Sequence, residues 1–125
     1  ISNVEGGIML LEDRIVKFAA QCVKTCAMIP VKLVGSANFA DQMFRSATSV
    51  AANYAEACEA ESSKDFVHKL KIAMKELSET RVWLKLIGES GYIENAKLSD
   101  LIAESKELSR ILSASVATTK KKIGG

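Results

Sequence analysis

The stretch "KDFVHKLKIAMKELSETRVWLKLI", residues 64–87, carries the pattern that decides the fold. Apolar or small side chains recur along it every three or four positions, which is the period of an α-helix that buries one face. Ser62 and Ser63 come just before it, and Asp65 follows Ser62 by three residues, a spacing typical of a helix start. We therefore predict a helix over about 63–87 that packs as one member of a helical bundle. The predicted core stripe is Phe66, Leu70, Ala73, Leu77, Thr80, Leu84 and Ile87.

The same period extends through the rest of the chain, which predicts three further helices over about 8–29, 37–59 and 96–121. Pro30 ends the first of them, and Gly35 with Ser36 offers a break and an N-cap for the second. The predicted core stripes are Ile8, Leu11, Ile15, Phe18, Cys22 and Cys26, then Ala40, Met43, Ala47, Val50, Tyr54 and Cys58, and finally Leu98, Leu101, Ser105, Leu108, Leu112 and Ser115.

Four helices with short connections predict an all-α fold, an antiparallel up-and-down four-helix bundle. The 125 residues suffice for one domain, so we predict a single domain over 1–125. The balance of 48% hydrophobic and 26% charged residues is typical of folded globular proteins. No apolar run approaches the ~20 residues of a membrane span. The odd count of three cysteines and the lack of a signal peptide predict reduced thiols and a cytoplasmic location.

The second predicted helix contains an unusual centre, "RSATSVAANYAE", residues 45–56. Between its flanking charges stand small residues, several of them Ser, Thr or Asn, which prefer caps and turns to helix interiors. We interpret this as a helix that is packed closely on more than one side, by its own bundle or by a neighbouring subunit. Arg45 should then pair with one or more of Glu56, Glu76 and Glu79. The predicted polar network is Arg45, Ser46, Ser49, Asn53, Glu56, Glu76 and Glu79. It either sets helix register and subunit packing, which we favour, or contacts a ligand or protein at a pore or cleft.

The third predicted helix has a second stripe, about 100° from its core stripe, which includes Ile72, Trp83 and Leu86. An aromatic side chain beside aliphatic ones, mixed with carboxylates, is typical of a subunit interface. We therefore predict that these three residues contact another copy of the chain. The alternative is a wide core face with Trp83 covering the end of the bundle.

The face of the third predicted helix opposite its core stripe is basic. It predicts a candidate nucleic-acid contact, although a solvated face is the alternative. The net charge of +2 does not by itself indicate nucleic-acid binding, so a basic surface must come from such clustering. The candidate residues are Lys64, His68, Lys71, Lys75 and Lys85.

The sequence gives no support for catalysis, a metal or a cofactor, and we predict that the protein is not an enzyme. His68 is the single histidine, so a di-iron bundle, which needs two Glu-x-x-His motifs, has no match. Cys22 and Cys26 lie one helical turn apart, but no further ligand pair is visible for a structural zinc site. We interpret both as core thiols.

The motifs "FRSATSVAANYAEA", "KDFVHKLKIAMKELSETRVWLKLI" and "SGYI" resemble the bacterial four-helix-bundle proteins encoded in intervening sequences of large-subunit ribosomal RNA genes. The resemblance covers roughly residues 8–120. The family motif places Gly after its Glu, where this chain has Ala57, a better helix former. The residues that match the family pattern are Arg45, Ser46, Ser49, Val50, Asn53 and Glu56, followed by Phe66, Leu70, Ala73, Glu76 and Glu79.

The resemblance implies a bundle fold and a ring-shaped homopentamer. A branch of the family serves diversity-generating retroelements as an accessory protein that binds the reverse transcriptase and nucleic acid. The resemblance therefore implies that the partners are further copies of the chain, with RNA, DNA or a reverse transcriptase as candidates. The alternative is a pure protein-interaction module with no role in nucleic-acid binding.

Overall fold

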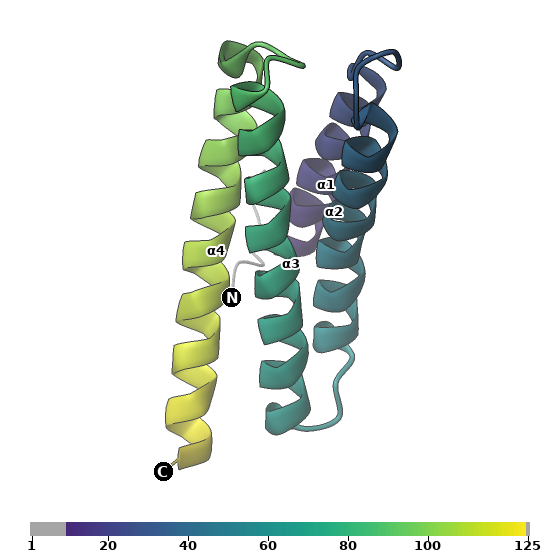
Figure 1. The fold of residues 1–125 in the computed structure, drawn as a ribbon. Coiled ribbons are helices and arrows are strands. Elements are labelled where there is room, and N and C mark those ends of the chain that lie inside the picture. Colours follow the sequence, from purple (N-terminus) through teal and green to yellow (C-terminus); the bar gives the residue numbers. More distant parts are fainter. Residues whose placement is uncertain (1–9, 125) are drawn as a thin grey trace.

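A computed structural model describes residues 10–124, and the chain folds there into the predicted all-α four-helix bundle (Figure 1). The helices are α1 (Leu11–Ala27), α2 (Ser36–Cys58), α3 (Ser63–Glu89) and α4 (Asn95–Gly124). Figure 1 shows that consecutive helices run in opposite directions, with their connections at alternate ends of the bundle. Ile8, the predicted start of the first helix, lies outside the described residues.

One helix end differs from the sequence prediction in a way that affects packing. The third helix was predicted to end at about residue 87, but α3 continues through Gly88 to Glu89. A side chain at Gly88 would collide with Asn95, because a Cβ there would stand 2.1 Å from Asn95 Oδ1. The lack of a side chain at Gly88 therefore allows the end of α3 to lie against the start of α4.

The helix starts are capped differently from one another. Of the two candidate caps, Ser62 and Ser63, it is Ser62 that caps α3, since its side chain accepts a hydrogen bond of 3.0 Å from the Asp65 backbone N–H. The prediction that Ser36 caps α2 is wrong. Gly35 occupies the N-cap position with a φ of +76°, a conformation that favours glycine. The Ser36 hydroxyl is buried and instead donates to the Val31 carbonyl at 3.1 Å.

The core follows the predicted stripes along most of the bundle, with Phe18, Met43, Leu70 and Leu108 among its fully buried side chains. Where α1 finishes and α2 begins, the predicted core residues Cys26 and Ala40 are only half-buried. The other wrong predictions lie at the end where α2 finishes, α3 begins and α4 finishes. There Cys58 is exposed, and Phe66 and Ser115 are only half-buried. The buried residues at those levels are Ala57, Val67 and Val116. A helix drifts by about 20° per heptad, so the choice between a step of three and a step of four becomes uncertain near a helix end.

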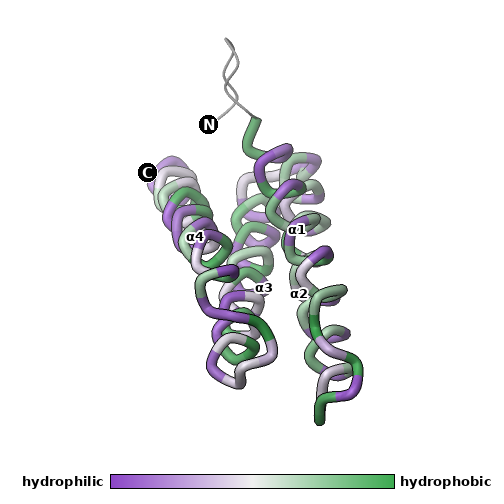
Figure 2. The backbone as a smooth tube through the Cα atoms, turned by 90° about the horizontal axis from the view of Figure 1, so that it is seen from above, coloured by the Kyte–Doolittle hydropathy of each residue, from purple (hydrophilic) through white to green (hydrophobic). Residues whose placement is uncertain are grey.

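The four helices do not pack equally closely. Figure 2, a view from above, shows α1 beside α2 and places α3 between α2 and α4. Each consecutive pair packs extensively, whereas α1 and α4 pack much less extensively against each other. The bundle therefore presents two kinds of groove, a tight one along α3 and α4 and a looser one between α1 and α4.

Candidate functional site

The structure exposes all five basic residues predicted for a nucleic-acid contact, Lys64, His68, Lys71, Lys75 and Lys85. It also brings Lys120 of α4 next to Lys71 of α3, which the sequence analysis did not anticipate. The pKa of Lys71 is lowered from its ordinary value by the close approach of the Lys120 ammonium group, because a second positive charge disfavours the protonated form of Lys71. Two ammonium groups from different helices therefore lie next to each other on the surface.

A hollow of about 380 Å³ lies beside this pair, where α3 begins and α4 ends. Its surface is mostly apolar, and it is lined by Lys64, Val67, Lys120, Ile123 and Gly124. The hollow shows that Lys64 and Lys120 border the same depression. The cationic surface consequently extends from Lys71 toward the start of α3.

The carboxylates of the predicted polar network lie on a different side of α3, facing α2. Arg45 donates to Glu76 Oε1 at 3.1 Å and also forms an ion pair with Glu79. This confirms two of the three predicted partners of Arg45. The Arg45 side chain is 49% exposed, so the pairing takes place at the surface of the bundle. The Arg45 charge holds the pKa of Glu79 below its ordinary value, mainly through their hydrogen bond.

The remaining members of the predicted network do not join this cluster. Glu56, the third candidate partner of Arg45, instead accepts a hydrogen bond of 2.8 Å from Lys69. Asn53 donates to the Ser49 carbonyl and hydroxyl one turn earlier in α2, both at 2.9 Å. The single predicted network is therefore divided into separate contacts: Arg45 with Glu76 and Glu79, Glu56 with Lys69, and Asn53 with Ser49. Ser46 belongs to a further contact inside the core.

Ser46 forms a buried contact with Thr80, a residue that the sequence analysis assigned only to the core stripe. Thr80 Oγ1 and Ser46 Oγ lie 2.8 Å apart, and both side chains have no exposed surface. The contact links α2 to α3 inside the core. A serine at a buried helix position was the signal for a polar partner, because buried hydroxyls are almost always paired.

The three residues predicted for a subunit interface differ in how much surface they leave open. The Trp83 ring packs edge-on against Phe39 of the same chain, with centroids 5.6 Å apart, and its Nε1 donates to Glu79 at 3.3 Å. Ile72 is half-buried, whereas Leu86 is 41% exposed. Part of Trp83 is therefore buried without a second copy, as in the alternative of a wide core face. Leu86 leaves apolar surface open to a partner.

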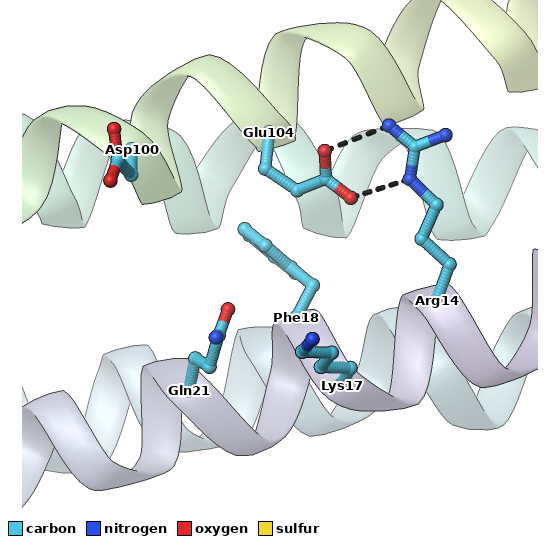
Figure 3. A pocket seen from close by; sticks show the side chains of 6 residues that line it. All are labelled: Arg14, Lys17, Phe18, Gln21, Asp100 and Glu104. Atoms are coloured by element: carbon cyan, nitrogen blue, oxygen red, sulfur yellow. Dashed lines mark hydrogen bonds and ion pairs between the residues drawn. The ribbon is translucent and has the colours of Figure 1, made fainter. Parts of the chain in front are cut away.

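The loose groove between α1 and α4 contains a polar cleft of about 420 Å³ (Figure 3). Arg14 spans it by donating to both carboxylate oxygens of Glu104, at 2.7 and 2.9 Å. This bond raises the pKa of Arg14. The other residues that line the cleft are Lys17, Phe18, Gln21 and Asp100. Positive and negative side chains from the two helices face each other there, so the cleft has no dominant charge.

Within residues 10–124, no group of three or more His, Cys, Asp and Glu side chains is arranged to hold a metal ion. Cys22 is fully buried, and burial raises its pKa to about 12. Cys26 is half-buried and donates through its thiol to the Ala40 carbonyl at 3.4 Å. None of the helices in the described part of the chain is long and apolar enough to cross a membrane.

Comparison with known families identifies the relatives of this bundle. The sequence model of the 23S rRNA-intervening sequence protein family matches residues 12–114, which is most of the chain. This chain belongs to that family. The predicted resemblance to proteins of ribosomal RNA intervening sequences is thereby confirmed, and the matched range includes every predicted site residue.

A solved structure supports the same assignment. The chain is similar to a solved protein of unknown function from the S23 ribosomal protein family of Bacteroides thetaiotaomicron VPI-5482, with 31% sequence identity and a TM-score of 0.77. The similarity covers 85% of this chain and 97% of that one. No curated protein sequence matches the chain.

Proposed function

We propose that this member of the 23S rRNA-intervening sequence family is a non-enzymatic, homo-oligomeric bundle that binds the phosphate backbone of nucleic acid. In this role it acts as an accessory or scaffold for the nucleic acid, or for an enzyme that works on it, such as the reverse transcriptase of a diversity-generating retroelement. The observation that carries the proposal is the grouping of exposed lysines where α3 meets α4: Lys64 and Lys120 line one hollow, and Lys71 lies next to Lys120.

Two adjacent ammonium groups repel each other, which costs free energy in the isolated protein. The lowered pKa of Lys71 reflects that repulsion. An anion that binds between them removes the repulsion and gains two charge-assisted contacts. A phosphate backbone supplies such anions in a row, and the exposed Lys64, Lys75 and Lys85 continue the basic surface along α3. In a homopentamer, five copies would repeat this surface around a ring.

A filter-binding titration with RNA and with DNA, at ~50 mM and ~200 mM salt, tests the proposal. Three phosphate contacts per bound chain would lower the affinity for duplex DNA roughly 40-fold between the two salt concentrations. The double variant Lys71→Glu with Lys120→Glu should lose at least 10-fold in affinity at the lower salt concentration, because it replaces the paired cations with anions. It should also flatten the salt dependence.

The matched control reverses two lysines outside this surface, Lys24→Glu with Lys97→Glu, and thus changes the net charge of the chain by the same amount. Both lysines are exposed. We expect this control to retain most of the affinity. Failure of the wild-type protein to bind RNA or DNA at ~50 mM salt, or equal losses in both double variants, would remove the support for a defined site on α3 and α4.

A second candidate function is a protein-interaction module without nucleic-acid binding. The observation that favours it is the exposed apolar side chain of Leu86, beside the predicted interface residues Ile72 and Trp83. This candidate predicts that charge reversal at Lys71 and Lys75 leaves the cellular function intact, whereas substitution of Trp83 abolishes it. The first candidate predicts that the lysine variants lose function.

A further inference from the structure

Arg81 of α3 is bound in an unusual way in the seam between α3 and α4. It is half-buried, and its Nε donates to Ser105 Oγ at 2.8 Å. Its Nη2 donates to the Ser105 carbonyl at 3.2 Å and to Ser109 Oγ at 2.6 Å. All three acceptors are uncharged. Among the described residues no carboxylate forms an ion pair with Arg81, whereas the other arginines of the chain, Arg14, Arg45 and Arg110, each pair with glutamate.

This arrangement leaves a charge and several donors without partners. Partial burial of a guanidinium is unfavourable unless its charge is compensated. The group has five N–H donors, and the three hydrogen bonds use only Nε and Nη2. The two N–H groups of Nη1 make no hydrogen bond to the described residues. The Ser109 hydroxyl accepts from Arg81 and donates to none of those residues, so its proton is also free.

The position of Arg81 continues the basic surface around Lys71. Along α3, ten residues separate Lys71 from Arg81, which is about 15 Å at the rise of an α-helix. Along α4, eleven residues separate Ser109 from Lys120, which is about 16 Å. The two contacts, Arg81–Ser109 and Lys71–Lys120, therefore lie along the same seam, separated by nearly the same distance on α3 and on α4. Lys85 follows Arg81 by one helical turn and lies on the same side of α3.

Four acidic residues of the two helices lie on other sides. Glu76 and Glu79 of α3 face α2, where Arg45 binds them. Glu104 and Asp100 of α4 face α1 and line the cleft there. The seam between α3 and α4 thus presents cations and hydroxyls, and these four carboxylates are directed elsewhere.

We propose that Arg81 and Ser109 form a phosphate-binding position, in which Nη1 of Arg81 and the Ser109 hydroxyl donate to one phosphate group. The buried Ser105 holds the guanidinium in place from below. Guanidinium groups bind phosphate oxygens through paired N–H donors, which a lysine cannot reproduce. The inference rests on the proposed function in naming a backbone phosphate of RNA or DNA as the ligand. A free phosphate would bind by the same chemistry.

The test compares Arg81→Gln, Ser109→Ala and wild type in titrations with a single-stranded RNA oligonucleotide between ~50 and ~200 mM salt. For Arg81→Gln we expect a 5- to 20-fold loss of affinity at the lower salt and a salt slope smaller in magnitude by about 0.7, the value of one phosphate contact on a single strand. Ser109→Ala, which keeps the charge, should weaken binding 2- to 5-fold with an unchanged slope. Arg110→Gln is the control, because Arg110 pairs with Glu107 on α4 and should retain wild-type binding.

The outcomes separate this inference from the proposed function. If Arg81→Gln binds RNA with the wild-type slope while Lys71→Glu with Lys120→Glu does not bind, Arg81 is only a clamp between helices and the inference fails. If wild type binds neither RNA nor DNA, the proposed function fails, and inorganic phosphate becomes the probe. A shift of the Arg81 Nε–H signal in an NMR titration with phosphate, but not with chloride at equal ionic strength, then supports a site for free phosphate. No shift overturns the phosphate site altogether. This titration uses the wild-type protein, so a variant that fails to fold does not leave the question open.

Discussion

Replacement of Thr80 by valine should measurably destabilise the bundle, because it removes the buried hydroxyl contact between α2 and α3. Thr80 Oγ1 lies 2.8 Å from Ser46 Oγ and 2.8 Å from the Glu76 carbonyl, and Ser46 Oγ lies 3.3 Å from the Met43 carbonyl. Each hydroxyl has only one proton to donate, and each has a backbone carbonyl of its own helix within reach as an acceptor. The contact across the helices is the part that either single substitution destroys.

The expected magnitude follows from what each substitution leaves behind. Valine has the shape of threonine, so Thr80→Val opens no cavity, and Ser46 can still donate to the Met43 carbonyl. The free energy of unfolding should therefore fall by the net value of one hydrogen bond, about 1 kcal/mol, or about 4 °C in melting temperature for a domain of this size. Ser46→Ala should cost less, about 0.5 kcal/mol, because alanine is the better helix former.

The double variant Ser46→Ala with Thr80→Val decides whether the contact itself is stabilising. With both partners apolar, no hydroxyl is left without its counterpart, so the double variant should be no less stable than Thr80→Val alone. Urea unfolding of the four proteins, followed by circular dichroism at one fixed protein concentration, gives the coupling energy. Thr48→Val is the control, because Thr48 bonds only to carbonyls of its own helix. Losses that simply add in the Ser46–Thr80 double variant would refute the reasoning.

Three further predictions concern the surface of the bundle. Glu79→Gln should lower the free energy of unfolding by less than about 1 kcal/mol at pH 7, because its partner Arg45 is 49% exposed. Since the folded-state pKa of Glu79 is lowered, this stabilisation is present above the ordinary glutamate pKa and is lost as the pH falls through the folded-state value, so melting curves of variant and wild type should converge in acid. In a thiol-modification time course on native protein, the exposed Cys58 should react first, and Cys22, whose pKa is raised to about 12, should react only on unfolding. If Leu86 lies in a subunit interface, light scattering should show a smaller particle for Leu86→Lys than for wild type, and a wild-type monomer near 13.5 kDa would contradict the interface.

The helical period predicted the fold class and most of the core, because a bundle stripe depends only on spacing within each helix. The errors at Cys58, Phe66 and Ser115 share a cause. Near a helix end few neighbours constrain which side chain points inward, and the choice depends on how that helix leans on the others. Spacing within one helix does not contain that information.

The candidate site was predictable where it depends on neighbouring helices joined by a short connection. Arg45 and its carboxylates fall at one level because α2 and α3 form such a pair. Lys120 was missed because its approach to Lys71 depends on the register of α4 against α3 far from the connecting turn. Arg81 was missed because its acceptors are uncharged serine groups, which a search for opposite charges does not find. One signal was present in the sequence. Ser105 stands at a core position of the fourth predicted helix, and a buried serine requires a polar partner, which the structure shows to be Arg81.

The distribution of charge around α3 explains how a chain with a net charge of only +2 can present a cationic surface. Its carboxylates Glu76 and Glu79 are bound to Arg45 on the α2 side, across a helix whose diameter is about 10–12 Å. At physiological ionic strength the Debye length is about 8 Å, so those carboxylates are largely screened from a ligand in the seam between α3 and α4. Under the proposed function, a polyanion in that seam would interact with Lys71, Lys120 and Arg81 rather than with the net charge of the protein. Its binding should then change little when the Arg45 pairs are removed, which would separate the residues that stabilise the bundle from those proposed to bind a ligand.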